Sequence, residues 1–125
     1  MTQTIKWIEL AICLLLFGAI PEGTMAADLQ TAGGTADAAA VLLQADSDFD
    51  RAVAAGGVEA WVAYFAEDGI MFRTGEVVRG HAAIREMMAP AFATPGFSLR
   101  WKPVHADIGA SGDLGYTYGT YENSS

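Results

Sequence analysis

Cysteine and basic residues are both scarce in this 125-residue chain. Its only cysteine, Cys13, lies near the N-terminus, so no disulfide can staple a domain built from residues 27–125. Seven Lys and Arg stand against 15 Asp and Glu, which gives a formal net charge of −8. A chain this acidic lacks the basic patch with which proteins bind nucleic acid or anionic membrane surfaces. We therefore exclude both kinds of partner.

Signatures of metal and nucleophilic chemistry are missing from the sequence too. The two histidines, His81 and His105, fall in different predicted elements and have no metal-ligand spacing between them. There is neither a GxSxG nucleophile motif nor a phosphate-cradling glycine loop. We expect both histidines to lie at the surface, and we predict no metal and no cofactor.

Aspartates at three alternate positions, Asp46, Asp48 and Asp50, are spaced like the start of a calcium-binding loop. Such a loop also needs a glycine at its sixth position and a glutamate at its twelfth. These positions hold Arg51 and Gly57, so the pattern fails. We predict instead that the three carboxylates form a solvated helix face.

No apolar run in the sequence reaches the length of about 20 residues that a membrane-spanning helix needs. The longest run, Leu10–Ile20, follows Lys6 and ends before Pro21. A basic start followed by a short apolar stretch and small residues is typical of a secretory signal peptide. We predict that residues 1–26 are cleaved and that the domain is exported, periplasmic or secreted, without stable membrane insertion. An uncleaved anchor is the alternative.

Residues 27–35 are polar and contain glycine, and we expect a mobile lead-in there. The remaining residues, 36–125, are enough for one small domain. Apolar residues recur on one face between residues 36 and 55, which predicts a helix that ends at Gly56-Gly57. A second helix is predicted by the same spacing at Val58, Trp61, Val62 and Phe65.

A hairpin and a third helix are predicted next. Asp68-Gly69 is a turn signal, and strands are expected at residues 70–73 and 76–79. The third helix starts after Gly80, and Pro90 should kink or shorten it. Its apolar stripe consists of Ile84, Met87, Met88, Ala91 and Phe92.

Two further strands are predicted in the C-terminal part of the sequence. Phe97, Leu99 and Trp101 alternate with polar residues, and Pro103 interrupts the pattern, which favours a β-bulge. The last strand, residues 114–121, should carry Leu114, Tyr116 and Tyr118 on one face and small residues on the other. The small face would let a helix or a ligand approach closely.

The stretches FAEDGIMF and VVRGHAAIREMM resemble the nuclear transport factor 2-like superfamily. The similarity covers residues 38–121 and is closest to the SnoaL-like and ketosteroid-isomerase-like members and to a branch of exported bacterial proteins of unknown function. The resemblance implies an α+β cystatin-like cone, with three helices packed on a curved antiparallel sheet, an apolar pocket at its open end and frequent dimers. It also implies one or two further strands, so we expect the sequence to be truncated after Ser125.

The ketosteroid isomerase chemistry does not carry over to this sequence. That enzyme uses a carboxylate base and an oxyanion hole made of a tyrosine and a protonated aspartic acid. Aligned on FAEDG, the base position falls on Arg73 and the tyrosine position on Phe49, and neither can do the required proton transfer or donation. Asp107 is near the third position in order but is expected on a polar face. Isomerisation by that mechanism is not predicted.

Two other residues are candidates for a site. Arg73 at the pocket mouth could bind an anionic ligand, or it could simply pair with Glu76. Asp68 is a weak candidate for a catalytic base, and the alternative is a turn residue. The residues predicted to line the pocket are Phe49, Trp61, Phe65, Met71, Arg73, Trp101, Tyr116 and Tyr118.

The sequence therefore predicts an exported domain that binds a small apolar or amphiphilic molecule, anionic if Arg73 contacts it. One alternative is a lyase-, cyclase- or isomerase-type enzyme that uses other residues. A further alternative is a dimerisation module with a vestigial pocket. A homodimer is expected in each case.

Overall fold

The computed structural model describes residues 32–125, and the predicted signal peptide lies outside them. Helix α1 (Ala32–Ala63) starts inside the segment that the sequence assigned to a mobile lead-in. Residues 32–35 are helical, and alanine, the residue with the highest helix propensity, recurs through the residues that follow. The helix therefore begins four residues before its predicted start.

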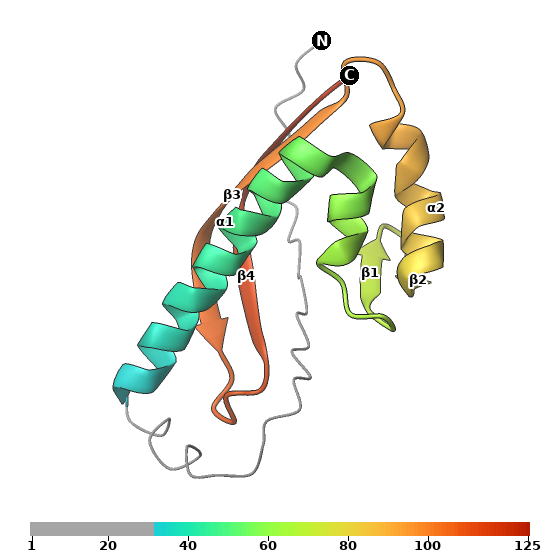
Figure 1. Cartoon of the computed structure of the whole chain (residues 1–125). Helices are drawn as coiled ribbons and strands as arrows, with labels where there is room; N and C mark the ends of the chain where they lie inside the picture. Colours follow the sequence, from blue (N-terminus) through green and yellow to red (C-terminus); the bar gives the residue numbers. More distant parts are fainter. Residues whose placement is uncertain (1–31) are drawn as a thin grey trace.

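A kink at Gly57 divides α1 into two segments (Figure 1). Gly57 has φ 61° and ψ −141°, a conformation that a residue with a Cβ rarely adopts. The break in the helical backbone falls at the predicted helix end, Gly56-Gly57, and separates two helical segments of α1. The described residues form two helices, of which the first is divided where the sequence predicted two separate helices.

The predicted hairpin is confirmed to the residue. Strands β1 (Ile70–Arg73) and β2 (Glu76–Arg79) pair antiparallel, with Arg73 opposite Glu76. Helix α2 (His81–Phe92) follows directly, and Pro90 lies in its last turn. The proline does not break α2, since the helix ends two residues later.

Strands β3 (Ser98–Ile108) and β4 (Gly115–Ser124) form a second antiparallel hairpin. The register shifts between Pro103 and His105, which confirms the predicted bulge. Gly119 lies opposite Pro103, and a Cβ built there would be 2.0 Å from the carbonyl oxygen of Lys102. The close approach of the two backbones at the bulge therefore requires glycine at this position.

The two hairpins form separate two-stranded sheets. The α+β class is as predicted, but the described residues do not form the single curved sheet of the predicted cone. In Figure 1, β3 and β4 run along α1, while α2 and the β1–β2 hairpin lie beside the kinked end of α1. One sheet therefore covers the long segment of α1, and the other elements surround its short segment.

The core lies where these elements meet. It is built from Phe49, Val53, Trp61, Val62, Met71, Val78 and Ile84. On β4, Thr117 is buried, whereas Tyr116 and Tyr118 are exposed, so the predicted small face is the one that packs on α1. A Cβ on Gly115 would lie 2.8 Å from Cδ2 of Leu42 in α1. Neither helix in residues 32–125 combines the length and hydropathy of a membrane span.

Candidate functional site

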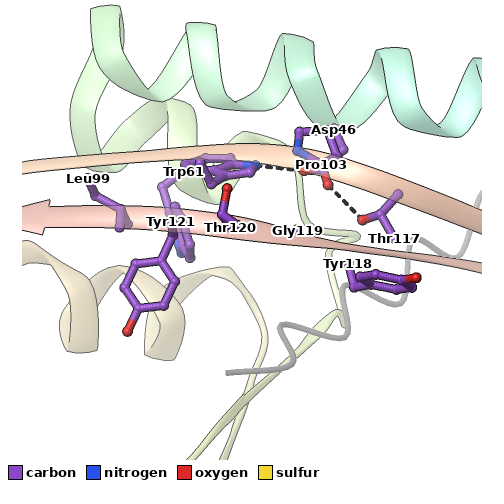
Figure 2. Close-up of a pocket in the computed structure, with 10 residues that line it drawn as sticks. Asp46, Trp61, Leu99, Pro103, Thr117, Tyr118, Gly119, Thr120 and Tyr121 are labelled. Carbon is purple, nitrogen blue, oxygen red and sulfur yellow. Dashed lines mark hydrogen bonds between the residues drawn. The ribbon is translucent and has the colours of Figure 1, made fainter. Parts of the chain in front are cut away.

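An apolar cavity of about 170 Å³ lies between α1 and the β3–β4 hairpin (Figure 2). Helix α1 contributes residues from both sides of its kink, and β4 contributes five consecutive residues. Consecutive strand residues alternate between the two faces of the sheet, so β4 lines the cavity with more than the side chains of one face. The lining residues are Asp46, Trp61, Leu99, Trp101, Pro103, Thr117, Tyr118, Gly119, Thr120 and Tyr121.

Asp46 provides the only charged side chain of this lining. Its Oδ1 accepts a hydrogen bond from Nε1 of Trp101 at 2.7 Å, and its Oδ2 accepts one from Oγ1 of Thr117 at 2.6 Å. The carboxylate therefore links the helix to both strands of the hairpin. Both donors are neutral groups, so the negative charge of Asp46 is hydrogen-bonded but not neutralised.

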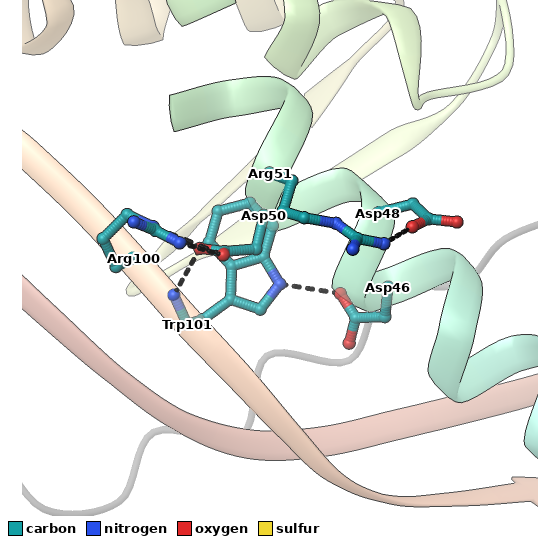
Figure 3. A network of polar contacts seen from close by, with 6 residues as sticks. All are labelled: Asp46, Asp48, Asp50, Arg51, Arg100 and Trp101. Atoms are coloured by element: carbon teal, nitrogen blue, oxygen red, sulfur yellow. Dashed lines mark hydrogen bonds and ion pairs between the residues drawn. The ribbon is translucent and has the colours of Figure 1, made fainter. Parts of the chain in front are cut away.

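One helical turn further along α1, Asp50 holds the same strand (Figure 3). Its carboxylate accepts hydrogen bonds from the guanidinium of Arg100, the shortest at 2.7 Å from Nη2 to Oδ2. Oδ1 also accepts the backbone N–H of Trp101 at 2.8 Å. The guanidinium of Arg100 holds the pKa of Asp50 below its ordinary value, and the N–H of Trp101 lowers it too, against the opposite effect of burial.

Trp101 is thus fixed at two points, its backbone N–H by Asp50 and its indole N–H by Asp46. Its ring packs edge-on against Trp61 and Phe49, with ring centroids 5.7 Å and 4.8 Å apart. This geometry is a favoured one for aromatic pairs. Among the described residues, the buried indole N–H of Trp61 has no hydrogen-bond partner. Two orthogonal indoles therefore form a rigid wall of the cavity.

The structure brings together three of the residues that the sequence assigned to the pocket: Trp61, Trp101 and Tyr118. Phe49, Phe65 and Met71 do not line this cavity. They pack in the core beside it, since Phe49 is 2 % exposed and stacks on Tyr64 with centroids 4.5 Å apart. The predicted pocket was too wide because core and lining residues have the same apolar spacing.

The remaining candidates lie away from the cavity. Arg73 is exposed at the end of β1, and Tyr116 is exposed on β4. Asp68 is an exposed turn residue whose carbonyl oxygen accepts a long contact of 3.4 Å from Arg79. Asp107 is also exposed, and its carboxylate accepts the backbone N–H of Ile108. None of these side chains lines the cavity.

The histidines have different surroundings. His105 is exposed, as predicted, and its ring packs near Tyr118. His81 is only partly exposed, contrary to the prediction, because Nε2 makes a 2.8 Å hydrogen bond with the carbonyl oxygen of Phe65. Within residues 32–125, no three His, Cys, Asp or Glu side chains are grouped so as to hold a metal ion.

The prediction of a solvated face for the three aspartates is wrong at two positions. Asp50 is 6 % exposed and Asp46 is partly buried, whereas Asp48 pairs with exposed Arg51 on the outside. The sequence does contain the missed signal. Asp46 and Asp50 are four residues apart and share a helix face with buried Phe49 and Val53, where an acidic side chain needs a partner.

Comparison with known families gives one match. A family model described as the SnoaL-like domain matches residues 47–124, which is more than half of the chain. Most of the cavity lies in this range, and Asp46 immediately precedes it. Comparisons with curated proteins and with solved structures gave no match.

Proposed function

This chain belongs to the SnoaL-like domain family of the nuclear transport factor 2-like superfamily, and from this premise we propose that it binds a small apolar molecule in the cavity between α1 and the β3–β4 hairpin. The observation that carries the proposal is a partly open, largely apolar space with a single charged side chain in its lining. Ligand sites are typically lined by apolar and aromatic side chains with a few polar groups that fix orientation. This cavity has that composition.

The size of the cavity limits the ligand. Its volume of about 170 Å³ is close to that of an engineered cavity of ~150 Å³ that takes up benzene. A single ring with a short substituent therefore matches this volume. A larger molecule would have to extend out of the cavity.

The test uses toluene as the probe. Trp61 and Trp101 are the only tryptophans of residues 27–125, and both line the cavity, so tryptophan fluorescence and indole N–H signals report on it. We expect toluene to perturb both indole signals and to raise the melting temperature, because a ligand that binds only the folded state stabilises it.

A filled cavity should abolish this binding. Leu99→Trp places a large ring in the lining and should weaken toluene binding at least about tenfold. Val41→Trp is the matched control, because Val41 is exposed and does not line the cavity. If toluene leaves both indole signals of the natural chain unchanged, the binding proposal fails and a module with a vestigial pocket is the better description.

An isomerase- or cyclase-type activity is the second candidate, and Asp46 is the observation that favours it. A carboxylate beside an apolar cavity could accept a proton from a bound carbon acid. NMR can follow deuterium exchange of the α-protons of cyclohexanone in D₂O. If the natural chain accelerates this exchange and the Asp46→Asn variant does not, the result supports an enzyme. If cyclohexanone binds but its α-protons do not exchange faster, the result favours a binding protein.

The proposal includes export of the domain, which rests on residues 1–26 of the sequence. In a bacterial host, the purified protein should begin at Ala27. Retention of the first 26 residues in the folded product would contradict cleavage.

A further inference from the structure

We propose that the cavity selects a cation, namely a small apolar ring that carries a protonated amine, with the ammonium group held by Asp46. This inference rests on the proposed binding function and adds the charge of the ligand to it. The negative charge of Asp46 and the absence of a basic side chain from the lining together point to this class.

Asp46 differs from the two neighbouring aspartates of α1 in its partners. Asp48 forms an ion pair with Arg51, and Asp50 forms one with Arg100 at 2.7 Å. In the described part of the chain, Asp46 has no ion-pair partner, and its two hydrogen-bond donors are an indole and a hydroxyl. A partly buried carboxylate without a counter-ion is electrostatically unfavourable, so a cationic ligand would supply the missing charge.

The carboxylate has room for a further bond. A carboxylate offers about four lone-pair sites. Asp46 uses one on each oxygen, for Trp101 and for Thr117. About two remain, and Asp46 lines the cavity, so an ammonium ion bound there would be able to form charge-assisted hydrogen bonds with it, which are stronger than neutral ones.

The aromatic wall suits the apolar part of this ligand. Trp61 and Trp101 line the cavity with indole rings at 82° to each other. A ligand ring can pack against these indoles while its charged group reaches Asp46. A benzoate-like anion would also meet the charge of Asp46, so the anionic ligand suggested by Arg73 is not retained.

The test compares four probes of similar size that differ in polarity: benzylamine, benzyl alcohol, toluene and benzoate. Affinities are measured at pH 7 and low salt from the two indole N–H signals. We expect benzylamine to bind at least about tenfold more tightly than benzyl alcohol or toluene, and benzoate to bind weakest. Added salt should weaken the binding of benzylamine and leave the binding of toluene unchanged.

Two matched variants assign the effect to one side chain. Asp46→Asn should remove the advantage of benzylamine, so that the affinities for benzylamine and for toluene become equal within about twofold. Asp48→Asn removes a carboxylate of the same helix that does not line the cavity, and it should change neither. If Asp46→Asn does not fold, the four-probe series on the natural chain still decides, because the probes share one ring and differ only in the charge and polarity of its substituent.

Each result has one meaning. Equal affinities for benzylamine and toluene overturn the charge inference and leave the apolar binding site in place. Preference for benzoate overturns it as well. If none of the four probes binds, the proposed function itself fails.

Discussion

Asp50 shows how one buried side chain can fix the position of a strand. It is 6 % exposed, and four donor contacts from Arg100 and Trp101 surround its two oxygens. Such a group is stabilising only while every partner is present, because a buried carboxylate left without donors is strongly unfavourable. Asp50 therefore anchors β3 to α1, and its contact with Trp101 places the wall of the cavity.

We predict that Asp50→Asn lowers the free energy of unfolding by about 2 kcal/mol, because the amide cannot accept from both Arg100 and the backbone. The free energy of unfolding is measured by urea denaturation, with circular dichroism as the signal. The control Asp48→Asn, on the outside of the same helix, should change stability by less than about 1 kcal/mol. If Asp48→Asn lowered the free energy of unfolding as much as Asp50→Asn does, Asp50 would not be the anchor of β3.

The ion pair between Asp50 and Arg100 predicts that stability depends on pH. The folded-state pKa of Asp50 is below its ordinary value of 3.8, so its contribution is complete above that value and is lost as the pH falls through the lowered pKa. The stability difference between the natural chain and Asp50→Asn should therefore shrink under acid conditions. Unfolding curves between neutral pH and the acid range measure it, and a constant difference would contradict the prediction.

At the scale of elements, the bend of α1 decides where the cavity lies. The segment before Gly57 supplies Asp46 to the lining, and the segment after it supplies Trp61. A straight helix would carry Trp61 away from the sheet and towards solvent, whereas the bend returns it to Phe49, with ring centroids 5.2 Å apart. The kink thus brings the carboxylate and the indole of Trp61 to the same cavity.

Gly57→Ala should destabilise the fold by roughly 1–3 kcal/mol, because φ 61° with ψ −141° is accessible almost only to glycine. Space is not the obstacle, since the nearest atom to a Cβ there, in Phe92, would be 3.9 Å away. The same substitution in the regular first turns of α1, Gly34→Ala, should be neutral or stabilising by up to about 1 kcal/mol. Melting curves distinguish the two, and equal effects would show that the bend does not depend on Gly57.

At the scale of the whole molecule, an apolar surface lies on the outer side of the β3–β4 hairpin. Its largest exposed members are Val104, Leu114 and Tyr116, with exposures from 44 % to 56 %. Scattered exposed apolar residues are ordinary, but a group on one sheet face is typical of an interaction surface.

We predict that this face mediates a homodimer, in line with the dimers common in the resembling superfamily. Light scattering after size-exclusion chromatography should give twice the mass of the chain, and Leu114→Lys with Tyr116→Lys should halve it. Phe72→Lys with Val77→Lys, on the exposed face of the other hairpin, is the control. A monomer mass for the natural chain at micromolar concentration would contradict the prediction.

The sequence alone determined the features that depend on near neighbours in the chain. The β1–β2 hairpin, the break at Gly57 and the bulge at Pro103 all follow from turn residues and from periodicity, because backbone geometry limits what glycine and proline permit. The family resemblance likewise followed from short stretches of sequence and agrees with the match over residues 47–124.

Only the tertiary structure decided the site. Asp46 meets Thr117, 71 residues away, and Asp50 meets Arg100, 50 residues away. Local spacing made these aspartates resemble a solvated acidic face, because a pattern along one helix does not record which strand lies against it. Burial and charge pairing are properties of the packed molecule, and they turned two apparent surface carboxylates into the anchor and the polar group of the cavity.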